Sequence, residues 1–142
     1  MLKRLLLTVL AAAVAAGLGY ADQSRTKVII PVSKTSPTSG KQMFTSYCAP
    51  CHGMDGKGHG PAAAALKMQP VDLTGLSRSN HGRFPDTHVA AVTQFGSEVQ
   101  AHGSAEMPVW GPILCKMDMT NTQERQLRIS NLSRYLESVQ TR

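Results

Sequence analysis

Two thiols and one imidazole lie close together in the chain, at Cys48, Cys51 and His52. If this stretch is helical, Cys48 and His52 lie one turn apart on the same helix face. Thiols at this spacing can add to the two vinyl groups on one edge of a porphyrin, which forms two thioether bonds. The histidine directly after the second cysteine can then bind the iron through an imidazole nitrogen. The pattern C-x-x-C-H therefore predicts covalent attachment of one c-type haem, with His52 as the proximal ligand.

Two other kinds of site also use a C-x-x-C pair. A structural zinc site needs a second pair of ligands, and the third cysteine, Cys115, stands alone in the sequence. A redox dithiol of the thioredoxin type needs a βαβ context, and the sequence contains no convincing run of strands. Both interpretations are weaker than haem attachment. Cys115 is interpreted as a buried small residue, with a reactive or chain-bridging thiol as the alternative.

The second axial position of the iron needs a ligand from elsewhere in the chain. Met107 is our candidate, because it lies in an irregular segment from which the chain can return across the other haem face. A thioether is a soft, neutral ligand that favours ferrous iron and raises the reduction potential. Spacing alone leaves this ligand open. The alternatives are His59, His81, His88, His102, Met43, Met54, Met68, Met117 and Met119.

The chain around these residues is predicted to be all-α. Aromatic residues make up only 5% of 142 residues, so the chain is short of core, and a buried porphyrin would supply an apolar centre. Apolar periodicity and helix propensity indicate about four short helices wrapped around one covalent haem. The predicted helices cover 40–47, 62–68, 84–95 and 120–139, and the predicted loops cover 53–61, 70–74 and 97–119.

The N-terminal segment is predicted to direct export. Residues 1–21 combine a charged start, an apolar run rich in alanine, and small residues at both cleavage-site positions, which is typical of a signal peptide. Residues 22–39 are interpreted as a flexible arm, and residues 40–142 as the haem domain. Export indicates a periplasmic protein, since covalent haem attachment takes place outside the bacterial cytoplasm. Contact with a membrane is expected only if the N-terminal segment stays uncleaved.

The formal net charge of +6 is spread along the chain. A basic stripe with interleaved aromatic residues, which nucleic-acid binding would require, is missing, so no nucleic-acid partner is expected. The lysines are interpreted as a solvated surface, with steering toward an acidic redox partner as the alternative.

Several further motifs surround the cysteine pair, and together they resemble the small class I monohaem c-type cytochromes of bacteria over about residues 40–139. The motifs are Gly40-x-x-x-Phe44, Tyr47-Cys48-Ala49-Pro50-Cys51-His52-Gly53, Asp55-Gly56-x-Gly58, Gly60-Pro61, Pro70-x-Asp72-Leu73-Thr74, Met107-Pro108-x-Trp110 and Tyr135-Leu136. The resemblance implies a cytochrome c-like fold, thioether bonds at both cysteines and Met107 as the distal ligand.

The resemblance also implies roles for residues around the haem. Gly40 and Phe44 would pack against the Tyr135 region of the last helix. The carbonyl of Pro61 would accept the second ring N–H of the proximal histidine. Trp110 would pack beside the haem and could donate a hydrogen bond to a propionate.

We therefore expect a periplasmic one-electron carrier rather than an enzyme, in which redox partner proteins dock at the exposed haem edge. One alternative is a haem subunit of a larger dehydrogenase or oxidase complex. A second is a peroxidase or gas-binding protein with a displaceable sixth ligand, for which His102 or His59 could act as the distal group.

Overall fold

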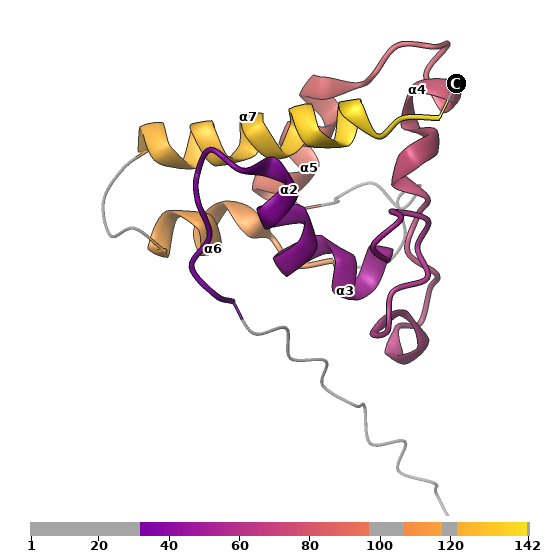
Figure 1. Cartoon of the computed structure of the whole chain (residues 1–142), viewed down its shortest axis with the longest axis horizontal. Coiled ribbons are helices and arrows are strands. Elements are labelled where there is room, and N and C mark those ends of the chain that lie inside the picture. The colour runs from indigo at the N-terminus through magenta and orange to yellow at the C-terminus, as the bar shows by residue number, and fades with distance from the viewer. Residues whose placement is uncertain (1–31, 97–106, 118–121, 142) are drawn as a thin grey trace, which may run out of the picture.

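The structure, a computed structural model, describes residues 32–96, 107–117 and 122–141. These residues form helices joined by turns and loops, with no strand among them, and the helices gather into one body (Figure 1). The predicted all-α class is confirmed. The predicted signal peptide, 1–21, lies outside the described residues. In the part that is described, no helix has both the length and the apolar character that crossing a bilayer demands.

The first helix carries the C-x-x-C-H motif. It runs through α2 (Gly40–Met43), the π-helical turn η1 (Phe44–Cys48) and α3 (Ala49–His52). The Ser39 hydroxyl caps its start by accepting a hydrogen bond from the Gln42 amide at 3.2 Å. Gly53, with a φ of 81°, follows its last residue and turns the chain away. The predicted helix before Cys48 is confirmed, and it continues through His52.

The last helix, α7 (Thr122–Ser138), crosses the first helix at close range (Figure 1). At the crossing, a Cβ on Gly40 would overlap the backbone carbonyl of Asn131, so glycine allows the two backbones to approach. Beside it, the ring centroids of Phe44 and Tyr135 lie 5.3 Å apart. This contact is the one that the resemblance implied between the two helices.

Helix α5 (Asp86–Phe95) agrees with the prediction of a helix over 84–95. It ends at Gly96, which has a φ of 84° and donates its amide to the Val92 carbonyl at 2.9 Å. The helix packs against both α7 and the helix that precedes α7. It therefore forms a fixed wall of the domain.

A further helix, α6 (Trp110–Lys116), lies where the sequence predicted a loop over 97–119. That prediction is wrong for this segment. Trp110 and Leu114 lie one turn apart and are only 4% and 3% exposed, so burial of one helix face stabilises the segment. Pro112 sits in the first turn, where a missing backbone donor costs little. Packing thus overrides the low helix propensity of the local sequence.

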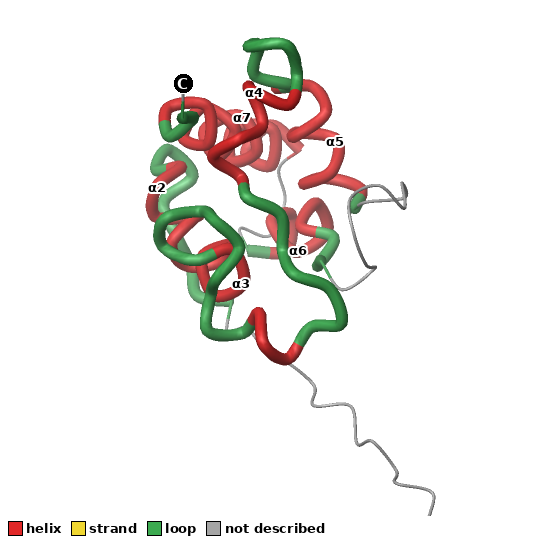
Figure 2. Tube along the Cα trace, turned by 90° about the vertical axis from the view of Figure 1, so that its right-hand side faces the viewer, coloured by secondary structure: helices red, strands yellow, loops and turns green. Residues whose placement is uncertain are grey.

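The stretch between the motif helix and α5 is mostly loop (Figure 2). Its short elements are η2 (Ala63–Ala65), η3 (Leu73–Gly75) and α4 (Leu76–Ser79). The predicted helix over 62–68 is wrong, because only one 3₁₀ turn forms there. Leu66 already has an extended backbone, with φ −91° and ψ 151°. The chain turns back at this point, which allows the side-chain amide of Gln69 to donate to the Gly58 carbonyl.

The predicted flexible arm, 22–39, is partly an ordered element of the domain. Its described part, 32–39, packs on α7. Thr35 is only 5% exposed, and its carbonyl accepts a hydrogen bond at 2.8 Å from the buried guanidinium of Arg128. The polar composition of this segment gave no sign that its backbone would pair with a buried donor. The ordered domain thus begins before Gly40.

The hydrophobic core is formed by residues of the first helix, α5, α6 and α7. The buried members are Met43, Phe44, Tyr47, Ala49, Val89, Trp110, Leu114, Ile129, Leu132 and Leu136.

Candidate functional site

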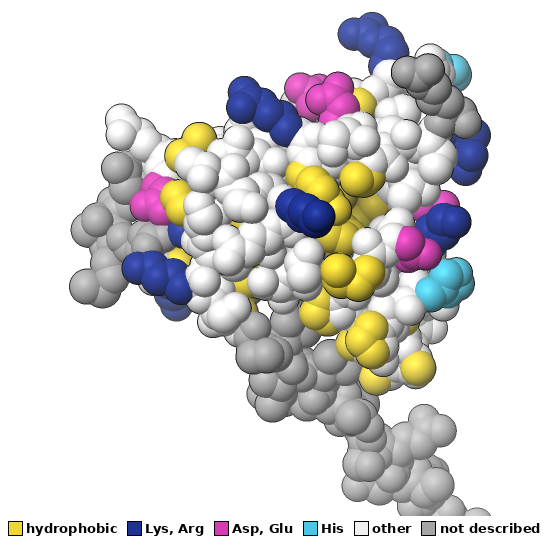
Figure 3. Space-filling view, in the orientation of Figure 1, with side chains coloured by type: hydrophobic (Ala, Val, Ile, Leu, Met, Phe, Trp, Pro, Cys, Tyr) yellow, Lys and Arg dark blue, Asp and Glu magenta, His cyan; other side chains and the backbone are white. Residues whose placement is uncertain are grey.

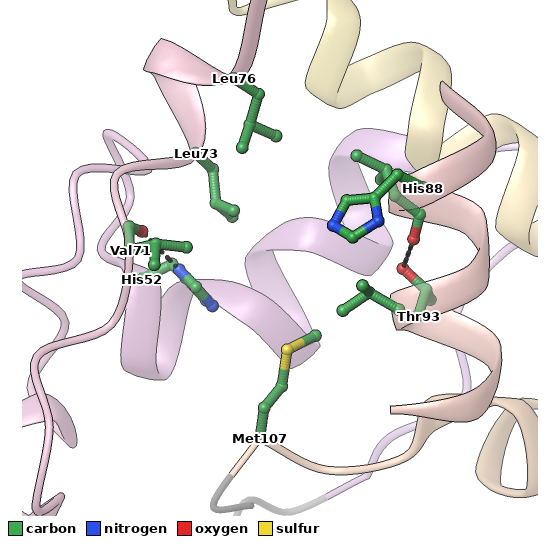
Figure 4. A pocket seen from close by; sticks show the side chains of 9 residues that line it. His52, Val71, Leu73, Leu76, His88, Thr93 and Met107 are labelled. Atoms are coloured by element: carbon green, nitrogen blue, oxygen red, sulfur yellow. Dashed lines mark hydrogen bonds between the residues drawn. The ribbon is translucent and has the colours of Figure 1, made fainter. Parts of the chain in front are cut away.

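A cavity of about 530 Å³, counted with its open mouth, lies beside the end of the motif helix (Figure 4). The walls are mostly apolar, with two imidazoles and one thioether among them. The residues that line it are His52, Val71, Leu73, Leu76, His88, Val89, Val92, Thr93 and Met107.

His52 is held in the state that a metal ligand requires. It is 9% exposed, and its Nδ1 lies 3.0 Å from the carbonyl oxygen of Val71 (Figure 4). Because a carbonyl can only accept, Nδ1 carries the proton and Nε2 keeps its lone pair. Burial lowers the pKa of His52, and the hydrogen bond to Val71 opposes this shift in part. The neutral tautomer with a free Nε2 is the one that binds iron.

The partner of His52 is the Val71 carbonyl, whereas the resemblance implied the carbonyl of Pro61. In the described structure Pro61 is exposed, at a turn where the next amide, of Ala62, donates to the Pro50 carbonyl at 2.8 Å. This turn leads the chain away from the imidazole. The chain comes back ten residues later, and there Val71 lies beside His52.

The glycine-rich loop after the motif closes the end of the motif helix. The amide of Gly58 donates to the His52 carbonyl at 2.7 Å, and the amide of Gly60 donates to the Cys51 carbonyl at 3.0 Å. These bonds satisfy carbonyls that a helix end leaves without partners. On the other side of the loop, a Cβ on Gly58 would overlap the Pro70 carbonyl oxygen. The loop thus fixes the spacing between the motif helix and the segment that contains Val71.

Asp72 fixes the backbone directly after Val71. One of its carboxylate oxygens accepts hydrogen bonds from the Thr74 amide at 2.8 Å and the Thr74 hydroxyl at 2.6 Å. The side-chain hydrogen bond from Thr74 is the main reason that the pKa of Asp72 is lowered. From the other end of the chain, the Thr141 amide donates to the Thr74 carbonyl at 2.9 Å. The C-terminal end of the domain therefore helps to position the segment that contains the partner of His52.

The two cysteines of the motif are free thiols in the polypeptide. Burial, with a smaller contribution from the nearby Cys51, raises the pKa of the Cys48 thiol to about 12. Burial also raises the pKa of Cys51. Redox dithiols have the opposite property, a lowered thiol pKa that supplies a reactive thiolate. The environment thus argues against the redox dithiol hypothesis and is compatible with thiols that become thioethers.

Met107 lines the same cavity as His52, with its side chain directed inward (Figure 4). Most of the alternative methionines lie elsewhere. Met43 is fully buried in the core, Met54 and Met68 are 68% and 52% exposed, and Met117 accepts a hydrogen bond from the Tyr47 hydroxyl. Met119 lies outside the described residues.

Of the alternative histidines, His88 lines the cavity, on the wall opposite His52 (Figure 4). His59, His81 and His88 are all exposed, but His59 and His81 do not belong to the lining. His102 lies outside the described residues. The structure therefore leaves Met107 and His88 as the described candidates for the sixth ligand.

Trp110 packs one layer behind the motif. It stacks on Tyr47, with ring centroids 5.3 Å apart and an angle of 29° between the rings. Trp110 is not among the residues that line the cavity. Because Tyr47 immediately precedes Cys48, the stack supports the backbone of the motif. A hydrogen bond from Trp110 to a haem propionate stays a prediction.

A zinc site finds no support in the described residues, among which no three His, Cys, Asp or Glu side chains gather to hold a metal ion. The residues present do fit a haem. The cavity is apolar, a neutral imidazole presents Nε2 to it, and the thiols that would attach the porphyrin belong to the same helix as that imidazole. The described residues contain helices and loops but no strand. Together with this cavity, they define the class of protein as an all-α haem domain.

Comparison with known proteins agrees with this class. A family model described as Cytochrome c matches residues 37–139, and the chain therefore belongs to the cytochrome c family. Neither a curated protein nor a solved structure matched the chain. Membership in the family means that the protein carries covalent haem c, with its iron, and takes part in haem-based electron transfer with redox partners.

Sequence reasoning missed one important member of the site, Val71. It acts through its backbone carbonyl. Every residue has such a carbonyl, so the residue type at position 71 gives no sign of this role. The Pro70-x-Asp72-Leu73-Thr74 motif is the available signal, because it lies over the same segment. The cavity also draws Leu76 and Val92 from helices that carry no motif of their own.

Proposed function

We propose that the protein is a periplasmic carrier of single electrons, in which one haem is ligated by His52 and Met107. The observation that supports this most directly is that both side chains line one apolar cavity, with Nε2 of His52 available to a metal. The haem supplies a ferric/ferrous couple that holds one electron when reduced. A single C-x-x-C-H motif in the sequence supports a single haem.

The residues of the chain set the conditions for this chemistry. The Val71 carbonyl holds the His52 ring in one orientation and raises the basicity of its ligating nitrogen. Apolar side chains at Leu73, Leu76 and Val92 exclude water from the cavity and lower its dielectric constant. The soft thioether of Met107 favours ferrous iron, so the proposed pair of ligands gives a high reduction potential.

We place the docking of redox partners at the exposed haem edge, near the cavity mouth. Figure 3 shows hydrophobic side chains gathered near the middle of one face of the domain, with a basic side chain among them and other charged side chains nearer the outline. Near the motif, Met54, Met68 and Val71 are 68%, 52% and 39% exposed, and exposed Lys57 and Lys67 lie in the same loops. An apolar surface with basic residues near it suits a brief contact with an acidic partner.

The export assignment rests on the sequence of residues 1–21, which resembles a signal peptide. A haem-loaded protein whose N-terminus is still Met1 would contradict cleavage, and would favour anchoring by an uncleaved segment.

An electron carrier differs from a haem enzyme or gas binder in its sixth coordination position. In the carrier a protein side chain already fills this position, and in the others it is open to small molecules. The purified protein should show low-spin spectra in both oxidation states, and carbon monoxide or cyanide should change them little over minutes. A redox titration should be reversible and follow a one-electron curve. A high-spin spectrum, or rapid binding of carbon monoxide to the ferrous protein, would contradict the proposal. Co-purification with a fixed partner under mild conditions would favour a subunit of a larger complex.

A further inference from the structure

His88 gives the cavity a second group on the distal side that can bind iron. Among the described residues, three side chains able to ligate iron line the cavity, namely His52, His88 and Met107. His52 is tied to Val71 on one wall. Figure 4 shows the His88 ring directed into the cavity from the opposite wall, with the Met107 side chain entering between the walls. Two side chains that could bind the iron on the distal side, His88 and Met107, therefore line the cavity.

The backbone of His88 belongs to a firmly packed helix. His88 lies in the first turn of α5, on the same face as Val92, and both line the cavity. Its neighbours on that face, Val89 and Thr93, are 8% and 6% exposed, and the Thr93 hydroxyl donates to the Val89 carbonyl at 2.8 Å. The attachment point of the imidazole is thus fixed at the cavity wall.

Met107 is held in a different way. It lies outside the helices, in the irregular residues that precede α6. Irregular segments open locally at a lower free-energy cost than packed helices do. Opening of this segment would remove the thioether from the cavity and leave α5 in place. An imidazole is also a harder ligand than a thioether, so it suits ferric iron better.

We propose that His88 is a second distal ligand, which binds the haem iron whenever the Met107 sulfur leaves it. This inference rests on the proposed ligation by His52 and Met107. One neutral ligand replaces another, so the exchange itself requires no oxidant or reductant. His88 would then keep the sixth position filled and closed to small ligands, and the reduction potential would fall, because an imidazole would take the place of a thioether.

The test compares the haem-loaded Met107→Ala variant with two double variants that contain the same substitution. Met107→Ala should stay low-spin, with a lower potential than the parent and little binding of carbon monoxide. Met107→Ala/His88→Ala should become high-spin and bind carbon monoxide at least tenfold more tightly. The matched control, Met107→Ala/His59→Ala, removes an exposed histidine that does not line the cavity, and should behave like Met107→Ala. Added imidazole should restore a low-spin spectrum to the Met107→Ala/His88→Ala protein, which shows that its pocket is folded.

Two outcomes would overturn the role of His88. The first is a high-spin Met107→Ala protein, in which no residue replaces the sulfur. The second is a Met107→Ala/His88→Ala protein that stays low-spin without added imidazole, in which another side chain does so. Failure of the proposed His52/Met107 ligation would look different, because Met107→Ala would then match the parent in its potential and in its sulfur-to-iron absorption band.

Discussion

Replacing His52 by alanine should reduce the yield of haem-loaded, low-spin protein by at least about tenfold. Loss of a partner outside the first coordination sphere alone costs 10–100-fold in metal affinity, and this change removes the ligand itself. It also leaves the Val71 carbonyl, which accepts a hydrogen bond at 3.0 Å, without its donor. Haem content per polypeptide and the visible spectrum would measure the effect.

The matched control is His59→Ala, since His59 is exposed and does not line the cavity. That variant should keep the haem content and the spectrum of the parent. Any His52→Ala protein that does carry haem should regain a low-spin spectrum when imidazole is added to fill the vacated position. A His52→Ala protein that is indistinguishable from the parent in yield and spectrum would show that His52 is not the proximal ligand.

Gly58→Ala should destabilise the haem-loaded protein by about 3 kcal/mol, through two separate effects. Gly58 has a φ of 89°, and a left-handed backbone costs a residue with a side chain about 1–2 kcal/mol. The new Cβ would also overlap the Pro70 carbonyl oxygen, and relief of such overlap typically costs about 1–3 kcal/mol. The required shift moves the segment that holds Val71 against His52. Denaturant unfolding followed through the haem absorbance would measure the loss.

Gly82→Ala separates the two effects. Gly82 has a φ of 80°, close to that of Gly58, but a Cβ there would have no neighbour within 4 Å. This control should therefore cost only the backbone strain, about 1–2 kcal/mol. If Gly58→Ala costs no more than Gly82→Ala, the contact between the glycine-rich loop and Pro70 does not position the site.

The parts of the site that depend on side-chain chemistry could be predicted from sequence. The proposed roles of Cys48, Cys51 and His52 follow from residue type and spacing, which are local signals in the sequence. The helix over 84–95 could be predicted because both its periodicity and its glycine stop are local signals. Local patterns of this kind are independent of the rest of the fold.

The parts that depend on tertiary packing could not be predicted in this way. Helix α6 forms because Trp110 and Leu114 are buried against other helices, although Gly111 and Pro112 disfavour helix locally. Thr35 is held in the domain by residues distant in sequence, because Arg128 donates to its carbonyl and its hydroxyl is hydrogen-bonded to the Tyr47 hydroxyl.

The choice among rival distal ligands also needed the fold. In the sequence, His88 is one histidine among several with no motif to mark it. Its place beside Met107 follows from the packing of α5 on α6 and α7, which brings one face of α5 to the cavity. Nothing in the spacing of the residues shows that packing.

The sulfur-to-iron charge-transfer band in the near-infrared spectrum of the ferric protein tests the central claim most directly, because it requires a sulfur ligand on the iron and the Met107→Ala variant shows which sulfur that is. The parent protein should show the band, and Met107→Ala should lose it. Met54→Ala should keep it, since that methionine is 68% exposed. The potential should fall by at least about 0.1 V in Met107→Ala, a fraction of the roughly 0.8 V that axial ligands span. A parent without the band, or a Met107→Ala protein that retains it, would contradict ligation by His52 and Met107.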